Sequence, residues 1–149
     1  MTYSDLRKGR YSENGCIYFV TATTYQREQY FNSLNTTRQL IRTMRVIEGE
    51  LGIRFICWVI MPDHAHWLIE LKNFHTISNV VNCIKGASAY NINNTLKRRG
   101  KFWQPNFYDR ALRKEENLKV VSRYIVANPL RAGLVSKIED YPHWDSIWI

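Results

Sequence analysis

Apolar and polar residues follow two different periods along the first half of the chain. Residues 16–24 are rich in β-branched and aromatic side chains, which predicts a strand. Within 35–52, apolar residues recur at helical spacing, and Gly52 is the expected stop. Residues 53–61 and 64–71 are two strand-like runs joined by the dipeptide Pro62-Asp63, which suits a tight antiparallel hairpin.

The second half of the chain continues with helical and strand-like segments. A helix is expected to begin near Thr76 or Ser78, because apolar residues recur on one face of the segment that follows. Residues 108–113 are compatible with one more strand. A third helix is expected over about 115–127 and ends before Pro129, because proline disfavours the α conformation in the preceding residue.

This order of elements predicts an α+β fold. We expect a ferredoxin-like or RRM-like sandwich, in which an antiparallel sheet has helices packed on one face. The 149 residues include 45% hydrophobic side chains, enough for the core of a single domain spanning 1–149. The aromatic tail, residues 139–149, is expected to fold back onto that domain.

The charge balance favours a polyanionic partner. Twenty-one lysines and arginines against 13 acidic residues give a formal net charge of +8, which favours nucleic acid ahead of a membrane. Nine tyrosines and five tryptophans provide rings that could stack on bases. The three cysteines are too widely spaced for a disulfide framework, and no apolar run is long enough for a membrane span. We therefore expect a soluble, cytoplasmic protein.

Two histidines one residue apart are the first candidate for chemistry. In a strand, His64 and His66 point to the same face about 6 to 7 Å apart, so that both rings can approach one cation at about 2 Å. Leu68 and Glu70 share this face, whereas the other face is continuously apolar and is expected to pack against helices. His-x-His also occurs by chance in many strands, so a metal site requires a third donor.

Tyr124 and Asn128 are the second candidate. At a spacing of i and i+4 they are neighbours on one edge of the third predicted helix. A tyrosine hydroxyl is a poor nucleophile at neutral pH unless a base, a cation or a polarised electrophile helps it. The alternatives are a tyrosine whose ring packs at the edge of the helix and an asparagine that only caps the helix before Pro129. The residues alone leave both alternatives open.

Three motifs in order resemble a known family. These are "WVIMPDHAHWLIE" (58–70), "FWQPNFYDRALR" (102–113) and "RYIVANPLRAGLV" (123–135), followed by "YPHW" near the end. Together they resemble the REP-associated tyrosine transposases, which are relatives of the single-tyrosine HUH transposases of small insertion sequences. The resemblance covers roughly residues 15–146.

The resemblance implies an activity and a role for each candidate. His64 and His66 would be the HUH metal ligands, Asn128 a third ligand and Tyr124 the nucleophile. The implied activity is that of a metal-dependent endonuclease and transposase, which cleaves and rejoins single-stranded DNA near hairpins through a 5′-phosphotyrosine intermediate. Mg²⁺ or Mn²⁺ fits this task.

The resemblance also implies a DNA partner with imperfect palindromes that fold into hairpins, bound by a monomer or a homodimer. Basic and aromatic side chains alternate in the segment after the second predicted helix. We expect this segment to contact DNA through Lys97, Arg98, Arg99, Lys101, Trp103, Arg110 and Arg113. A smaller basic arm lies at residues 7–11. The alternatives are that 97–101 is a solvated charge run and that Trp103 and Phe107 belong to the core.

Two other functions stay open. One is a domesticated, catalytically weak relative that binds hairpin DNA or RNA as a regulatory module. The other is a metal-dependent phosphodiesterase acting on small substrates. The presence of His64, His66 and Tyr124 together argues against a pure binding module, and the broad positive charge favours a polymeric substrate.

Overall fold

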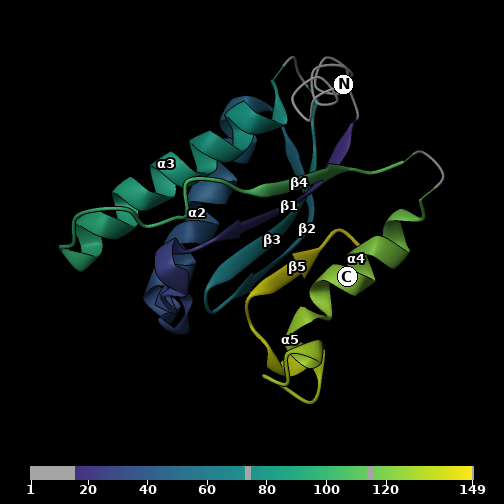
Figure 1. The fold of residues 1–149 in the computed structure, drawn as a ribbon. Helices are drawn as coiled ribbons and strands as arrows, with labels where there is room; N and C mark the ends of the chain where they lie inside the picture. The colour runs from purple at the N-terminus through teal and green to yellow at the C-terminus, as the bar shows by residue number, and fades with distance from the viewer. Residues whose placement is uncertain (1–15, 73–74, 114–115, 149) are drawn as a thin grey trace.

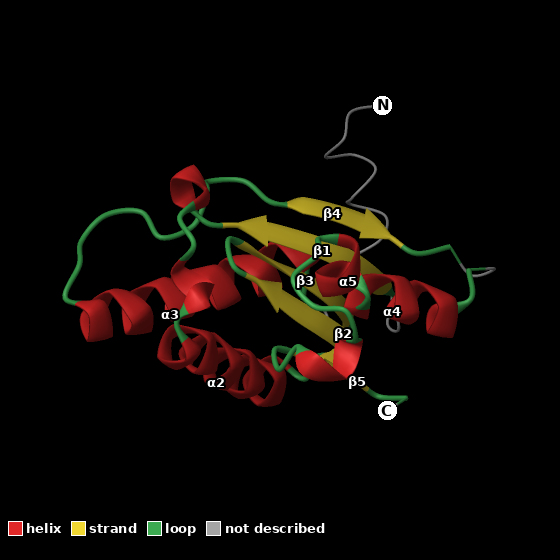
Figure 2. Ribbon diagram, turned by 90° about the horizontal axis from the view of Figure 1, so that it is seen from below, coloured by secondary structure: helices red, strands yellow, loops and turns green. Residues whose placement is uncertain are grey.

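The computed structural model describes residues 16–72, 75–113 and 116–148, and its centre is an antiparallel sheet (Figure 1). The strand order is β4-β1-β3-β2-β5, which can be followed from one edge to the other in Figure 2. The strands are β1 (Ile17–Thr23), β2 (Arg54–Met61), β3 (His64–Glu70), β4 (Tyr108–Ala111) and β5 (Trp144–Ser146). The α+β class and the antiparallel sheet are as predicted.

The hairpin of β2 and β3 places the histidine pair at the centre of this sheet. The two strands pair from Arg54–Glu70 to Met61–His64, and Pro62-Asp63 forms the two-residue turn that the sequence predicts. On its other side β3 pairs with β1, so that Thr23 lies opposite His64.

Two long helices cover one face of the sheet. They are α2 (Leu34–Leu51) and α3 (Ile77–Leu96). The side chain of Ser33 accepts a hydrogen bond from Thr36 N–H at the start of α2, and Gly52 ends this helix in the left-handed conformation with φ 64°. The side chain of Thr76 caps α3 in the same way, by accepting from Asn79 N–H.

The face of β3 that the sequence predicts to be apolar lies beneath these two helices. Its residues are all completely buried, namely Ala65, Trp67, Ile69 and Leu71. They pack with apolar residues of β1, α2 and α3 in the larger of two hydrophobic clusters. Because side chains alternate across a strand, this packing leaves His64 and His66 on the opposite face.

Helix α4 (Leu118–Val126) lies on that opposite face, on the other side of the sheet from α2 and α3 (Figure 1). Its residues Ile125 and Val126 pack against β2 and against Leu68 of β3. The expectation that helices pack on one face is therefore correct for α2 and α3 and wrong for α4. Helix α4 can pack on this second face because β2 is apolar on both sides. Seven of the eight residues of β2 are buried.

The C-terminal segment folds back onto the sheet, as predicted. Strand β5 pairs with β2, and the Tyr141 hydroxyl donates a 2.6 Å hydrogen bond to the carbonyl of Ile60. Short helices complete the fold, namely η1 (Tyr25–Arg27), η2 (Tyr30–Asn32), α5 (Asn128–Arg131) and η3 (Ile138–Asp140). Among the described residues, no helix has the length and hydropathy of a membrane span.

Candidate functional site

His64 and His66 project from the central strand of the sheet with their rings in contact. The ring centroids are 4.8 Å apart and the ring planes meet at 78°. Strand register places Thr21 of β1 beside His66 and Thr23 beside His64. The side-by-side arrangement predicted from the spacing is therefore present in the structure.

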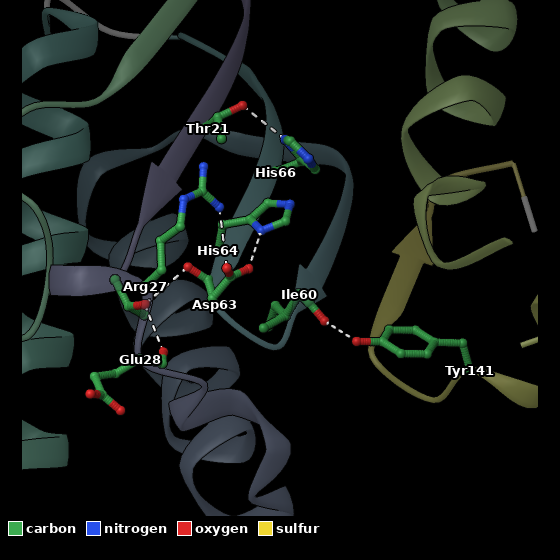
Figure 3. A network of polar contacts seen from close by, with 9 residues as sticks. Thr21, Arg27, Glu28, Ile60, Asp63, His64, His66 and Tyr141 are labelled. Atoms are coloured by element: carbon green, nitrogen blue, oxygen red, sulfur yellow. Dashed lines mark hydrogen bonds and ion pairs between the residues drawn. The ribbon is translucent and has the colours of Figure 1, made fainter. Parts of the chain in front are cut away.

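His66 is held from two sides. Its Nδ1 atom lies 2.8 Å from the Thr21 Oγ1 atom (Figure 3), and its ring stacks on Phe19 with 5.4 Å between centroids. Burial, followed by the positive charges of His64 and Arg131, lowers the pKa of His66 to about 3. The imidazole is therefore neutral at physiological pH, which is the form that binds a metal ion.

His64 is held by its neighbour in the turn. Its Nδ1 atom lies 2.6 Å from the Oδ1 atom of Asp63, and Arg27 donates to the other carboxylate oxygen at 3.2 Å (Figure 3). Burial raises the pKa of Asp63, but the hydrogen bonds and charges of His64 and Arg27 outweigh this effect and hold that pKa below its ordinary value. The carboxylate can only accept, so the proton of His64 lies on Nδ1.

These contacts leave the outer nitrogen of each ring available. In a neutral His64 with its proton on Nδ1, the Nε2 atom carries a free lone pair, and Thr21 can accept a hydrogen bond from Nδ1 of His66, which frees Nε2 there too. A hydrogen bond to Nδ1 is the usual way in which proteins orient a metal-binding histidine. Two imidazoles arranged in this way fit a divalent cation when both are neutral, although the described part of the chain contains no group of three His, Cys, Asp or Glu residues that could hold one. Among the described residues, a third protein ligand would be an amide or a hydroxyl.

Asn128 is in a different setting from the one that the sequence predicts. Helix α4 ends at Val126, Ala127 has ψ near 0°, and Asn128 is the first residue of the separate helix α5. Asn128 therefore lies just beyond the helix that carries Tyr124, close to the predicted helix end. The Nδ2 group of Asn128 donates to the Ile125 carbonyl at 2.9 Å, which is a local capping contact. That contact leaves its Oδ1 atom as the candidate ligand.

Tyr124 lies on the outer side of α4 and is 62% exposed. The guanidinium carbon of Arg131 lies 3.8 Å from the centroid of its ring. Arg131 also contributes to the lowered pKa of His66, so its charge acts on both candidate residues. Sequence reasoning missed Arg131, because its approach to Tyr124 depends on the bend between α4 and α5.

The predicted DNA-binding cations divide into exposed residues and residues with a partner within the protein. Lys97, Arg99, Lys101 and Arg113 are exposed. Arg98 donates to Asn93 Oδ1 at 2.6 Å and to the Lys101 carbonyl at 3.1 Å. Arg110 forms a 2.8 Å ion pair with Glu116. The basic arm at 7–11 lies outside the described residues.

Trp103 is a core residue and not a surface for bases. It is only 5% exposed, and its Nε1 group donates to Ser88 Oγ at 3.0 Å. An isolated β-bridge to Thr24 pulls this segment against the edge of the sheet, where the indole meets Trp67. The prediction that Trp103 stacks on DNA is therefore wrong, and the alternative of a core residue is correct.

The chain belongs to the family of IS200-like transposases, whose sequence profile matches residues 12–128. A REP-associated tyrosine transposase of Escherichia coli (strain K12) is 26% identical over 135 residues, which cover 89% of this chain and 78% of the relative. The solved structure of a REP-associated tyrosine transposase bound to a REP hairpin matches with a TM-score of 0.75 and 23% identity, over 91% of this chain and 79% of that chain. The resemblance predicted from the motifs is confirmed.

Proposed function

We propose that this protein cleaves and rejoins single-stranded DNA beside hairpins through a covalent link between Tyr124 and a 5′ phosphate. The observation that carries this proposal is the placement of Arg131. Its guanidinium covers the ring of Tyr124, and its charge adds to the effect of burial in lowering the pKa of His66 on the sheet. The arrangement would bring a phosphate-binding cation, a nucleophile and two imidazoles to one side of the sheet, in a chain of the IS200-like transposase family.

His64 and His66 would hold a divalent ion, Mg²⁺ or Mn²⁺, through their Nε2 atoms, with Asn128 Oδ1 as the third protein ligand. When bound, such an ion would polarise an oxygen of the scissile phosphate. Asp63 and Thr21 would keep the rings oriented by contacts to Nδ1. The low pKa of His66 would keep its ring neutral and ready to bind over the whole physiological pH range.

Tyr124 would act as the nucleophile. Its Oη atom attacks phosphorus and loses its proton to water, while the bond from phosphorus to O3′ breaks and the departing oxygen takes up a proton. Arg131 would hold a neighbouring phosphate oxygen close to the Tyr124 hydroxyl. Because the new ester retains the energy of the phosphodiester bond, a DNA 3′-hydroxyl can attack it and rejoin strands without ATP.

The exposed cations beyond α3 would hold the backbone of the hairpin. Lys97, Arg99 and Lys101 have side chains open to solvent, and the sequence has a net charge of +8. We infer a REP-like hairpin as the partner, because the matching solved structure is described as bound to a REP hairpin. A monomer and a homodimer would both be compatible with this surface.

A cleavage assay tests the proposal. Hairpin-bearing single-stranded DNA from beside the gene of this protein, labelled at the 5′ or the 3′ end, is incubated with Mn²⁺ or with EDTA and run on a denaturing gel. We expect a metal-dependent protein adduct on the strand with the 3′ label. Binding without any adduct, in either metal, would instead support the regulatory module.

A further inference from the structure

Three rings form a continuous row across the histidine face of the sheet. They are Tyr108 of β4, Phe19 of β1 and His66 of β3, and we call them the ring row. Phe19 stacks on His66 at 18° between ring planes, and it meets Tyr108 in an edge contact with 6.1 Å between centroids. The register supports this alignment, because Thr21 pairs with both Tyr108 and His66.

The outer end of the ring row is open to solvent. Tyr108 is 53% exposed, although it belongs to a strand of the sheet. Helix α4 covers the same face, but it packs over β2 and β5, which lie on the other side of β3. At its β4 edge this face therefore presents an exposed aromatic ring, two strands away from the candidate metal ligand His66.

Stacking on an aromatic ring is a general way of holding an unpaired base. Every base has a π face, and each such contact contributes about 1 to 3 kcal/mol with little dependence on sequence. Tyr108 meets Phe19 at 69° between ring planes and not in a parallel stack, and its exposed side chain is accessible to a base. Tyr108 and His66 lie two strands apart, which is a distance of roughly 10 Å. A stacked single strand covers this distance in about three nucleotide steps.

We propose that the ring row is a stacking surface for the single strand that flanks the scissile phosphate, with one base on Tyr108. This inference rests on the proposed function, because it takes His66 to mark the position of that phosphate. The contact would fix the path of the strand over the β4 edge of the sheet. It adds affinity without reading the base, so discrimination between sequences belongs to other contacts.

The test measures stacking directly and needs no metal ion. A hairpin oligodeoxynucleotide from beside the gene, with its single-stranded flank, carries the fluorescent base 2-aminopurine at one flank position at a time. Binding is followed in EDTA by fluorescence anisotropy, and stacking by quenching of 2-aminopurine. The variants are Tyr108→Ala and Tyr108→Phe, with Tyr90→Ala as the control, because Tyr90 is 69% exposed on α3 at the other face.

We expect wild-type protein to quench one flank position within about three steps of the scissile phosphate. Tyr108→Ala should lose that quenching and bind about 5- to 150-fold more weakly. Tyr108→Phe keeps the ring and should retain both properties, and Tyr90→Ala should behave as wild type.

Two results would overturn the inference while the proposed function stands. They are tight binding by wild type with no quenched flank position, and equal affinities for Tyr108→Ala and Tyr90→Ala. Absence of quenching in wild-type protein is decisive even where the alanine variant is unstable. Failure of wild type to bind the oligodeoxynucleotide at all would overturn the proposed function as well.

Discussion

Replacement of Asp63 by asparagine tests how the turn prepares His64 for a metal ion. The carboxylate lies 2.6 Å from His64 Nδ1, and the ion pair with Arg27 at 3.2 Å fixes its orientation. Asparagine has nearly the same shape and can still accept one hydrogen bond, but it has no charge. Loss of such an outer contact lowers metal affinity by about 10- to 100-fold, or about 1.4 to 2.7 kcal/mol. We expect Asp63→Asn at the lower end of this range and Asp63→Ala at the upper end.

The assay is titration with Mn²⁺, in which electron paramagnetic resonance measures the free ion without any DNA. Asp145→Asn is the matched control, because Asp145 is an exposed carboxylate with a weaker ion pair to Arg45 at 3.9 Å. The control should bind Mn²⁺ as wild type does. Equal Mn²⁺ affinities for wild type, Asp63→Asn and Asp63→Ala would refute the role of Asp63 in orienting His64.

Three further predictions concern charge, packing and pH. Arg99→Gln should weaken hairpin binding and reduce the slope of log K against log salt by about 0.7 to 0.9. Identical salt slopes for wild type and Arg99→Gln would leave Arg99 as solvated surface. Arg98→Gln should instead lower the melting temperature, because the Arg98 side chain forms hydrogen bonds within its own loop. Trp103→Ala should cost about 3 to 5 kcal/mol in urea unfolding, and a loss below about 1 kcal/mol would contradict its burial. The pKa of His66 is lower in the folded protein than in the unfolded chain. In EDTA, the contribution of neutral His66 to stability is therefore complete above about pH 6.5 and declines as the pH falls toward about 3. The decline is at most about 1.4 kcal/mol per pH unit. His66→Gln should flatten this decline, and an unchanged pH profile would count against a buried neutral imidazole.

Features that depend on local spacing could be predicted from the sequence. The hairpin of β2 and β3 and the common face of His64 and His66 follow from the period of a strand and from the turn at Pro62-Asp63. The start of α3 after Thr76 follows from its capping side chain. Each of these features involves residues that are close together in the chain.

Contacts between distant segments could not be predicted in this way. Thr21 meets His66, and Tyr108 meets Phe19, only because β1 lies between β3 and β4 in the sheet. Helix α4 packs on the histidine side of the sheet because β2 is apolar on that side too. A strand that is apolar on both faces does not indicate which helix covers which face. The basic run before Trp103 predicts a DNA-contacting position for this residue, but the bridge to Thr24 holds the segment against the sheet and the indole is buried.

The proposed function depends above all on a covalent bond between Tyr124 and DNA. The most direct measurement is to trap the adduct in Mn²⁺, digest the protein and the DNA, and identify the modified peptide by mass spectrometry, with Tyr124→Phe in parallel. We predict a nucleotide 5′ phosphate on the peptide that contains Tyr124, and no adduct in Tyr124→Phe, which should still bind the hairpin with nearly wild-type affinity. A phosphate attached to another residue, or undiminished adduct in Tyr124→Phe, would contradict the assignment of Tyr124 as the nucleophile.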